Sequence, residues 1–190
     1  MNFKATLQFL TDEELVAEIS KTKNTALFGL LYDRFCDVVY NKCYGFASSS
    51  DEAKDLTQDV FLKLFMKIDS FRGQSKFSTW LYAFTYNHCV NYVSRDKAKK
   101  MSMKSVPAEQ YGHLMVEADD YSLFQLQVSK LKKALELISA EDKMLLLLKY
   151  QDDLSVKELT QVLGIGESAV KMRLKRAKAR VIDLCNEKLD

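Results

Sequence analysis

The stretch LSVKELTQVLGIGESAVKMRLKRAKARV, residues 154–181, decides how the C-terminal part of this chain folds. Ser155 and Glu158 form a capping-box pattern, in which each side chain satisfies a free backbone N–H at the start of a helix. Gly164 and Gly166 then interrupt the apolar periodicity, because glycine adopts the backbone angles that a tight turn needs. The stretch therefore predicts two short helices joined at a sharp corner.

The second helix of this pair combines an apolar stripe with basic faces. Its stripe follows the helical spacing i, i+4, i+7 and i+11, and consists of Val170, Leu174, Ala177 and Val181. Residues 171–180 carry six basic side chains and no acidic one. A glycine-broken helix pair with a basic second helix is typical of a helix-turn-helix, which places its second helix in the major groove of DNA. The alternative is a solvated basic helix in an ordinary bundle.

The composition favours an all-α chain with two helical domains joined by a flexible linker. Its 190 residues contain one proline and six glycines, and no apolar run is long enough to span a bilayer. The N-terminal residues lack the basic start and apolar core of a secretory signal. The four cysteines form no CxxC pair and no metal-ligand spacing with the two histidines. We therefore expect a cytoplasmic protein with buried or half-buried thiols, no membrane insertion, no metal and no other cofactor.

The net charge of +2 hides two regions of opposite sign. Residues 51–59 hold four acidic side chains against one lysine, whereas the only charges in residues 171–180 are positive. This asymmetry indicates two surfaces and two different partners.

A capping pattern at Ser49 and Glu52 predicts a long helix that runs to about Asp69. One side of this helix is an apolar core stripe. The opposite side carries acidic, amide and apolar side chains together: Asp55, Gln58, Asp59, Leu62 and Met66. Apolar side chains ringed by polar ones can mark a protein-binding patch, although scattered exposed apolar residues are also common. The residues alone leave both interpretations open.

The segment that follows is predicted to be a loop around Gly73. It combines aromatic with basic side chains: Phe71, Arg72, Lys76 and Phe77. Flat rings for the bases and cations for the backbone are what a single-stranded nucleic-acid surface needs. The alternative for each phenylalanine is that it plugs back into the core.

Another helix is predicted to start with Ser78 or Thr79 as its cap and to end at about Ala98. One side of it carries Trp80, Asn87, Asn91 and Arg95. Asparagine is a poor residue inside a helix, and its amide can pair with an adenine edge or hold a base that has left the stack. This side is therefore a second candidate nucleic-acid contact, with a merely solvated polar side as the alternative.

These elements divide the chain into an N-terminal domain (residues 1–98), a linker (residues 99–121) and a C-terminal domain (residues 122–190). The linker contains the only proline, Pro107, and shows no sustained periodicity. Fully extended, roughly twenty residues of it could reach about 70 Å at ~3.3–3.6 Å per residue. The C-terminal domain is predicted to be a four-helix module: a leucine-rich helix from about Leu123, a buried helix capped by Ser139, and the helix-turn-helix.

Three segments of the chain together resemble one family. FRGQSKFSTWLYAFTYNHCVNYVSR, residues 71–95, is similar to the promoter-melting segment of bacterial RNA polymerase sigma factors. DEAKDLTQDVFLKLF, residues 51–65, resembles their core-polymerase-binding helix, and residues 137–181 resemble their C-terminal helix-turn-helix domain. The short chain, with no sizeable region between its domains, resembles the extracytoplasmic-function (ECF) branch of the sigma-70 family.

The resemblance implies a promoter-specificity subunit that binds core RNA polymerase and directs transcription initiation by recognising and opening promoter DNA. The acidic and apolar side chains around Asp59 would lie against the largest polymerase subunit. The loop from Phe71 to Phe77 and the helix with its two asparagines would open the upstream promoter element and capture an exposed base. The family also implies a membrane-anchored anti-sigma partner.

The second helix of the helix-turn-helix would, by the same resemblance, enter the major groove at the more distal promoter element. Lys171 and Arg176 would read guanines, whereas Lys175 and Lys178 would contact phosphates, which position the protein but do not specify sequence. The full predicted contact set is Ser168, Lys171, Met172, Lys175, Arg176 and Lys178. Two residues depart from the family pattern: Gly166 replaces the usual hydroxyl cap, and Met172 replaces a small polar residue.

Two other function classes compete with this one. A stand-alone DNA-binding regulator would use only the C-terminal domain, and it would need neither the side chains around Asp59 nor the aromatic loop. An enzyme would need a reactive cluster. His88 and Cys89 are adjacent on a helix, so their side chains diverge by about 100° and cannot form a nucleophile–base pair.

Overall fold

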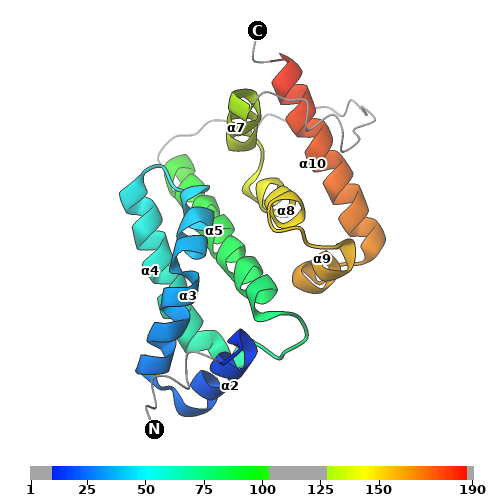
Figure 1. Cartoon of the computed structure of the whole chain (residues 1–190). Helices are drawn as coiled ribbons and strands as arrows, with labels where there is room; N and C mark the ends of the chain where they lie inside the picture. Colours follow the sequence, from blue (N-terminus) through cyan, green and yellow to red (C-terminus); the bar gives the residue numbers. More distant parts are fainter. Residues whose placement is uncertain (1–9, 103–127, 188–190) are drawn as a thin grey trace. The chain divides into compact units, whose positions relative to one another are not determined.

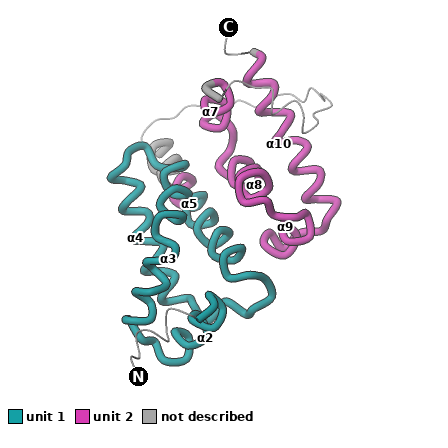
Figure 2. Tube along the Cα trace, viewed as in Figure 1, with its two compact units in different colours: residues 1–91 teal, residues 92–190 magenta. Residues whose placement is uncertain are grey.

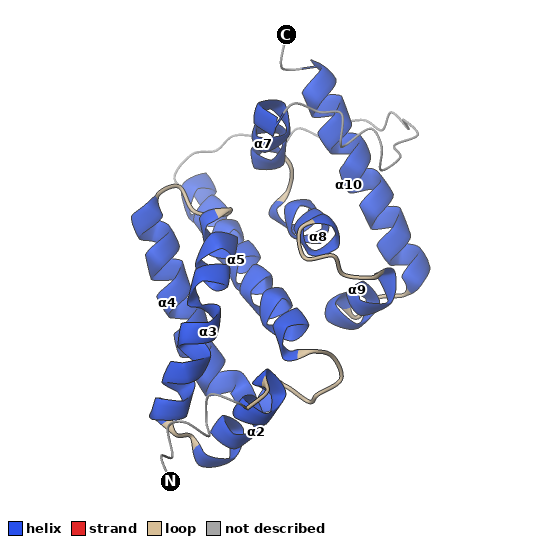
Figure 3. Ribbon diagram, in the orientation of Figure 1, coloured by secondary structure: helices blue, strands red, loops and turns tan. Residues whose placement is uncertain are grey.

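The computed structural model describes residues 10–102 and 128–187, and every regular element within these two ranges is helical (Figure 1; Figure 3). The prediction of an all-α chain is confirmed. The chain divides into two compact units, residues 1–91 and 92–190 (Figure 2). Within the described ranges, no helix is both long enough and apolar enough to cross a membrane.

The first unit contains four α-helices and one short 3₁₀ helix between residues 10 and 102, of which the last α-helix runs on past the division. Their bounds are α2 (Asp12–Thr22), α3 (Thr25–Tyr44), α4 (Ser50–Lys67), η1 (Ile68–Ser70) and α5 (Phe77–Ser102).

Polar caps set the first three helix starts. Thr11 accepts a hydrogen bond from the Glu14 backbone N–H, and the Glu14 carboxylate accepts one from the Thr11 N–H at 2.8 Å, which completes a capping box. This hydrogen bonding also lowers the pKa of Glu14. Asn24 caps α3 with its side-chain oxygen, which accepts from the Ala26 backbone N–H at 2.8 Å. Ser49 caps α4 as predicted.

The core of the first unit lies between α2, α3, α4 and α5. α3 packs against both α2 and α4. The core stripe predicted for this helix is confirmed, since Leu56, Val60 and Leu64 of α4 and Ile68 of η1 are all buried. Cys43 of α3 and Cys89 of α5 are fully buried thiols whose sulfur atoms lie 3.9 Å apart.

The start of α5 differs from the prediction. The helix begins at Phe77, so Ser78 and Thr79 lie in its first turn instead of capping it. The Phe77 backbone N–H donates to the Glu13 carboxylate at 2.8 Å, a contact between residues 64 positions apart. A carboxylate of α2 therefore satisfies a free N–H of α5, which local sequence patterns could not indicate. The helix also continues to Ser102, one turn beyond its predicted end.

The second unit has its described helices between residues 128 and 187. They are α7 (Val128–Leu137), α8 (Ala140–Tyr150), α9 (Val156–Leu163) and α10 (Glu167–Glu187). α10 packs against α7, α8 and α9. Ser139 caps α8, and that helix is mostly buried, as predicted. The predicted helix start at about Leu123, and the predicted linker from residue 103 onward, lie outside the described residues.

The helix-turn-helix corner has the predicted cap and a simpler turn. Ser155 and Glu158 form the capping box. Gly164 ends α9 in the left-handed conformation with φ of 64°, whereas Gly166 has no positive φ, so only one glycine is required by backbone geometry. The apolar stripe of α10 is buried as predicted: Val170, Leu174, Ala177 and Val181.

The contact between Glu13 and the start of α5 gives a first prediction. Glu13→Ala is expected to lower the free energy of unfolding by about 0.5–2 kcal/mol, the usual cost of losing an N-terminal helix cap. Urea unfolding can be followed by the fluorescence of Trp80, the only tryptophan of the chain. Glu18→Ala, at an exposed position of the same helix, is the control and should change stability little. Equal losses for the two variants would contradict the capping role.

Candidate functional site

One side of α4 forms a solvent-exposed strip that we name the α4 patch. Its apolar members are among the most exposed large hydrophobic side chains of the described residues, with Leu62 65% and Met66 77% exposed. Its polar members are exposed as well: Asp55, Gln58 and Asp59. The structure therefore brings all five predicted residues onto one face, opposite the buried stripe of the same helix. An exposed apolar pair bordered by acids is suited to binding another protein that offers apolar and basic groups.

Four aromatic rings meet where the loop after η1 enters α5. The Phe71 ring lies 5.4 Å from that of Phe77 and 5.6 Å from that of Trp80, and Trp80 stacks on Phe84 at 5.2 Å. Phe84 was missed by the sequence analysis, although its spacing of four residues from Trp80 is the signal that could have found it. The half-buried rings of Phe71, Trp80 and Phe84 reach the surface of the unit.

The structure contradicts the predicted nucleic-acid contact by Phe77, because this side chain is fully buried. Its ring packs edge-on against Phe35 of α3 at 5.5 Å. It therefore belongs to the core, as the alternative interpretation of this loop allowed, and it cannot offer a face to a nucleic-acid base in this arrangement.

The remaining predicted contacts of this region lie on the surface. Arg72 and Lys76 are accessible in the loop before α5, and three polar side chains of α5 itself are exposed: Asn87, Asn91 and Arg95. Cations, amides and half-buried aromatic rings are thus all present in this loop and along α5. Such a combination can stack on bases, hydrogen-bond their edges and neutralise phosphates.

The outward side of α10 carries most of its predicted contact residues. Ser168, Lys171, Met172, Lys175 and Arg176 are exposed, and Lys178 is half-buried. Lys171 pairs with Glu167 one turn earlier at 2.5 Å, and this lysine lowers the pKa of Glu167. The Lys171 ammonium must therefore exchange a carboxylate partner if it is to contact DNA.

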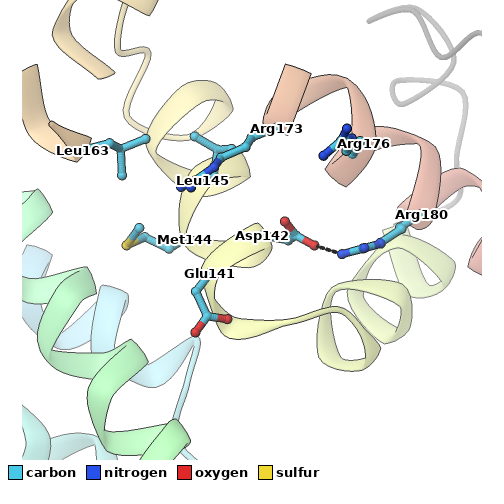
Figure 4. Close-up of a pocket in the computed structure, with 8 residues that line it drawn as sticks. All are labelled: Glu141, Asp142, Met144, Leu145, Leu163, Arg173, Arg176 and Arg180. Carbon is cyan, nitrogen blue, oxygen red and sulfur yellow. Dashed lines mark hydrogen bonds and ion pairs between the residues drawn. The ribbon is translucent and has the colours of Figure 1, made fainter. Parts of the chain in front are cut away.

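α10 has a lysine flank, with Lys171 and Lys178, and an arginine flank on its other side. Together with α8 and Leu163 of α9, the arginines line a cavity of about 370 Å³ in the second unit, which Figure 4 shows. Arg180 forms an ion pair with Asp142 across this cavity. Its other lining residues are Glu141, Met144, Leu145, Arg173 and Arg176. The division into a lysine flank and an arginine flank was not predicted, although the helical spacing of residues 173, 176 and 180 indicates it.

Two family models match the chain over most of its described length. Residues 31–99 match Sigma-70 region 2, and residues 129–181 match Sigma-70, region 4. The ECF RNA polymerase sigma factor SigW of Bacillus subtilis is 26% identical over 158 residues, which cover 80% of this chain and 84% of SigW. The ECF RNA polymerase sigma-E factor of Escherichia coli is 27% identical over 179 residues, which cover 90% and 93% of the two chains. The chain belongs to the ECF branch of the sigma-70 family.

Two solved structures share the fold. The sigma factor RpoE of Bartonella quintana, in complex with the anti-sigma factor NepR, matches with a TM-score of 0.60 and 22% identity, covering 85% of this chain and 98% of that one. CnrH, in complex with the cytosolic domain of CnrY, matches with a TM-score of 0.61 and 19% identity, covering 92% and 96%. As a member of its family, this sigma factor is a promoter-specificity subunit of RNA polymerase that directs transcription initiation.

The burial of Phe77 in this sigma factor gives a second prediction. Phe77→Ala is expected to lower the free energy of unfolding by about 3–5 kcal/mol, because it leaves a cavity in the core. Phe71→Ala, at a half-buried ring, is the matched control and should cost clearly less. Urea unfolding of both variants decides between a core and a surface role. A loss of promoter opening by Phe77→Ala without a loss of stability would contradict the core assignment.

Proposed function

We propose that this sigma factor docks on core polymerase through the α4 patch, opens promoter DNA with the loop before α5 and the polar side of α5, and reads a second element with α10. The observation that carries the proposal is the exposure of Leu62 and Met66 beside three polar residues. A helix that met only water would gain nothing from apolar side chains in this line, whereas burying them on a partner is favourable.

Charge supports the docking role of the α4 patch. Asp55 and Asp59 present two carboxylates, and a basic partner surface would be steered toward them before apolar contact forms. Leu62 and Met66 would then supply the area that loses water on binding. We propose that the partner surface is on the largest polymerase subunit, in line with the family resemblance.

The loop before α5 and the helix itself support a role in strand separation. Arg72 and Lys76 would hold the phosphate backbone of a separated strand, and half-buried Trp80 would offer an aromatic face at the edge of the core. Asn87 and Asn91 follow Trp80 on the same helix, and their amides could hold an unstacked base through its edge.

The outward residues of α10 would divide the work in the major groove. Arg176 can make paired hydrogen bonds to a guanine, and Lys171 can do so once it leaves Glu167. Lys175 and Lys178 would contact phosphates, while Met172 offers an apolar contact such as a thymine methyl group accepts.

We propose two further features on the basis of family likeness. The sigma factor RpoE was solved in a complex with the anti-sigma factor NepR, and CnrH was solved in a complex with the cytosolic domain of CnrY. An anti-sigma factor, membrane-anchored in line with the family, is therefore a proposed partner of this chain in the cytoplasm. The protein is proposed to act by binding alone, without catalysing a reaction itself.

Reconstitution tests the whole proposal. Purified chain added to core polymerase of its own genome should start transcription at a restricted set of promoters. A stand-alone regulator would instead bind duplex DNA tightly and sequence-specifically without polymerase. If core polymerase with this chain opens no promoter of that genome, the proposed function is wrong.

The α4 patch gives a third prediction. Asp59→Lys is expected to abolish association with core polymerase while the fold stays intact, because it places a cation where a basic partner surface would dock. Asp51→Lys makes the same charge change on α4 outside the patch, where the side chain is 87% exposed, and is the matched control. Pull-down with core polymerase and far-UV circular dichroism measure the two properties. Undiminished binding by Asp59→Lys would refute the docking role.

The division of roles on α10 gives a fourth prediction. Lys175→Ala in the reconstituted holoenzyme should weaken binding about equally on all promoter sequences and reduce the salt slope by about one phosphate contact. Arg176→Ala should relax the preference at one base pair, at a cost of ~1–3 kcal/mol. Binding titrations on a set of single-base promoter variants, at several salt concentrations, measure both effects. The same uniform loss for both variants would show that the two residues do not differ in role.

A further inference from the structure

A histidine of α5 lies against the α4 patch. His88 Nε2 is 3.5 Å from Asp59 Oδ2, and His88 Nδ1 is 3.3 Å from Lys63 Nζ. Lys63 Nζ is also 3.2 Å from Asp59 Oδ2, so the three side chains form a closed set of contacts between α4 and α5. Local sequence patterns cannot indicate the contacts of His88, because they join residues 25 or more positions apart.

The chemistry of these groups fixes the direction of the hydrogen bond between Lys63 and His88. A lysine ammonium only donates, so Nδ1 of His88 must accept from Lys63. Nε2 then carries the ring proton and faces the Asp59 carboxylate at 3.5 Å, an electrostatic contact that is too long for a well-formed hydrogen bond. The ring therefore connects a donor on one side with an acceptor on the other, and both partners belong to α4.

His88 is the most buried of the three side chains, and its ring is therefore the most fixed in position. The His88 side chain is 12% exposed, whereas those of Asp59 and Lys63 are 54% and 42% exposed. Long exposed side chains hold each other weakly, because water and rotamer freedom compete with the ion pair. A ring fixed by its surroundings loses little freedom when it holds a carboxylate, so His88 can orient Asp59 where Lys63 alone cannot.

We propose that His88 is a positioning residue for core-polymerase docking: it holds the Asp59 carboxylate in the orientation that the α4 patch presents to the polymerase. This inference rests on the proposed docking role of Asp59. Orienting Asp59 in the free protein means that less side-chain freedom is lost when the complex forms. His88 is also the neighbour of Asn87 on α5, so the same contact fixes the docking acid to the helix proposed to open DNA.

A double-mutant cycle with Asp59 tests the proposal. Affinity for core polymerase is measured by titrating fluorescently labelled full-length chain with core enzyme. His88→Leu is expected to weaken binding about three- to tenfold, the range of a typical coupling between contacting residues. In an Asp59→Ala background the same change should weaken binding no further, because the group that His88 orients is gone. An equal loss in both backgrounds would overturn the proposal, since His88 would then act through the fold alone.

Two amide variants separate positioning from packing and remain decisive if His88→Leu fails to fold. The glutamine amide of His88→Gln can accept from Lys63 and donate to Asp59, so this variant should keep affinity within about twofold. The amide of His88→Asn has the same chemistry with one methylene less reach and should weaken binding. If both amide variants bind as weakly as each other, or both bind normally, the proposal is wrong.

The cycle also distinguishes this inference from the proposed function. If Asp59→Ala alone leaves the affinity for core polymerase unchanged, the docking role of Asp59 fails first. If Asp59→Ala weakens binding and His88→Leu does not, only the positioning role fails.

Discussion

The burial of Phe77 determines where the first unit presents its polar side chains. Its ring lies against Phe35 of α3 and against Phe71 and Trp80 at the surface, and its backbone N–H is held by Glu13 of α2. The N-terminus of α5 is thereby attached to two other helices at the residue where it begins. The rotation of α5 about its axis follows from this attachment, and with it the faces on which later side chains lie. Asn87 and Asn91 point to solvent, while His88 reaches the acid of α4.

The sequence predicted the parts of the fold that depend on local signals. The caps Ser49, Ser139 and Ser155 and the buried stripe of α10 are where the patterns placed them, because hydroxyl caps and helical periodicity act within a few residues. The same reasoning failed at the start of α5, where a carboxylate from a distant helix provides the cap. It also could not decide between two roles for Phe77, since a phenylalanine in a loop serves a core and a surface equally well until its neighbours are known.

The candidate site shows the same division between local and distant effects. Periodicity alone placed all five members of the α4 patch on one face, and their exposure in the structure agrees with that pattern. Periodicity could not find the contacts of Asp59 with His88, or the pairing of Arg180 with Asp142 of α8, because both join separate helices. Arg180 and Asp142 offset each other's charge within the second unit. The charges that remain for partners are therefore fewer than the sequence counts.

Backbone conformation, and not the surrounding space, limits which residue can stand at the corner of the helix-turn-helix. A methyl group placed on the α-carbon of Gly164 would meet nothing within 4 Å, yet the residue has φ of 64°. An ordinary side chain would be disfavoured there because an L-amino acid crowds its own backbone at this angle. The chirality of the amino acid, and not the space around it, therefore limits what can stand at this position. A residue of the opposite hand would occupy the same corner without strain.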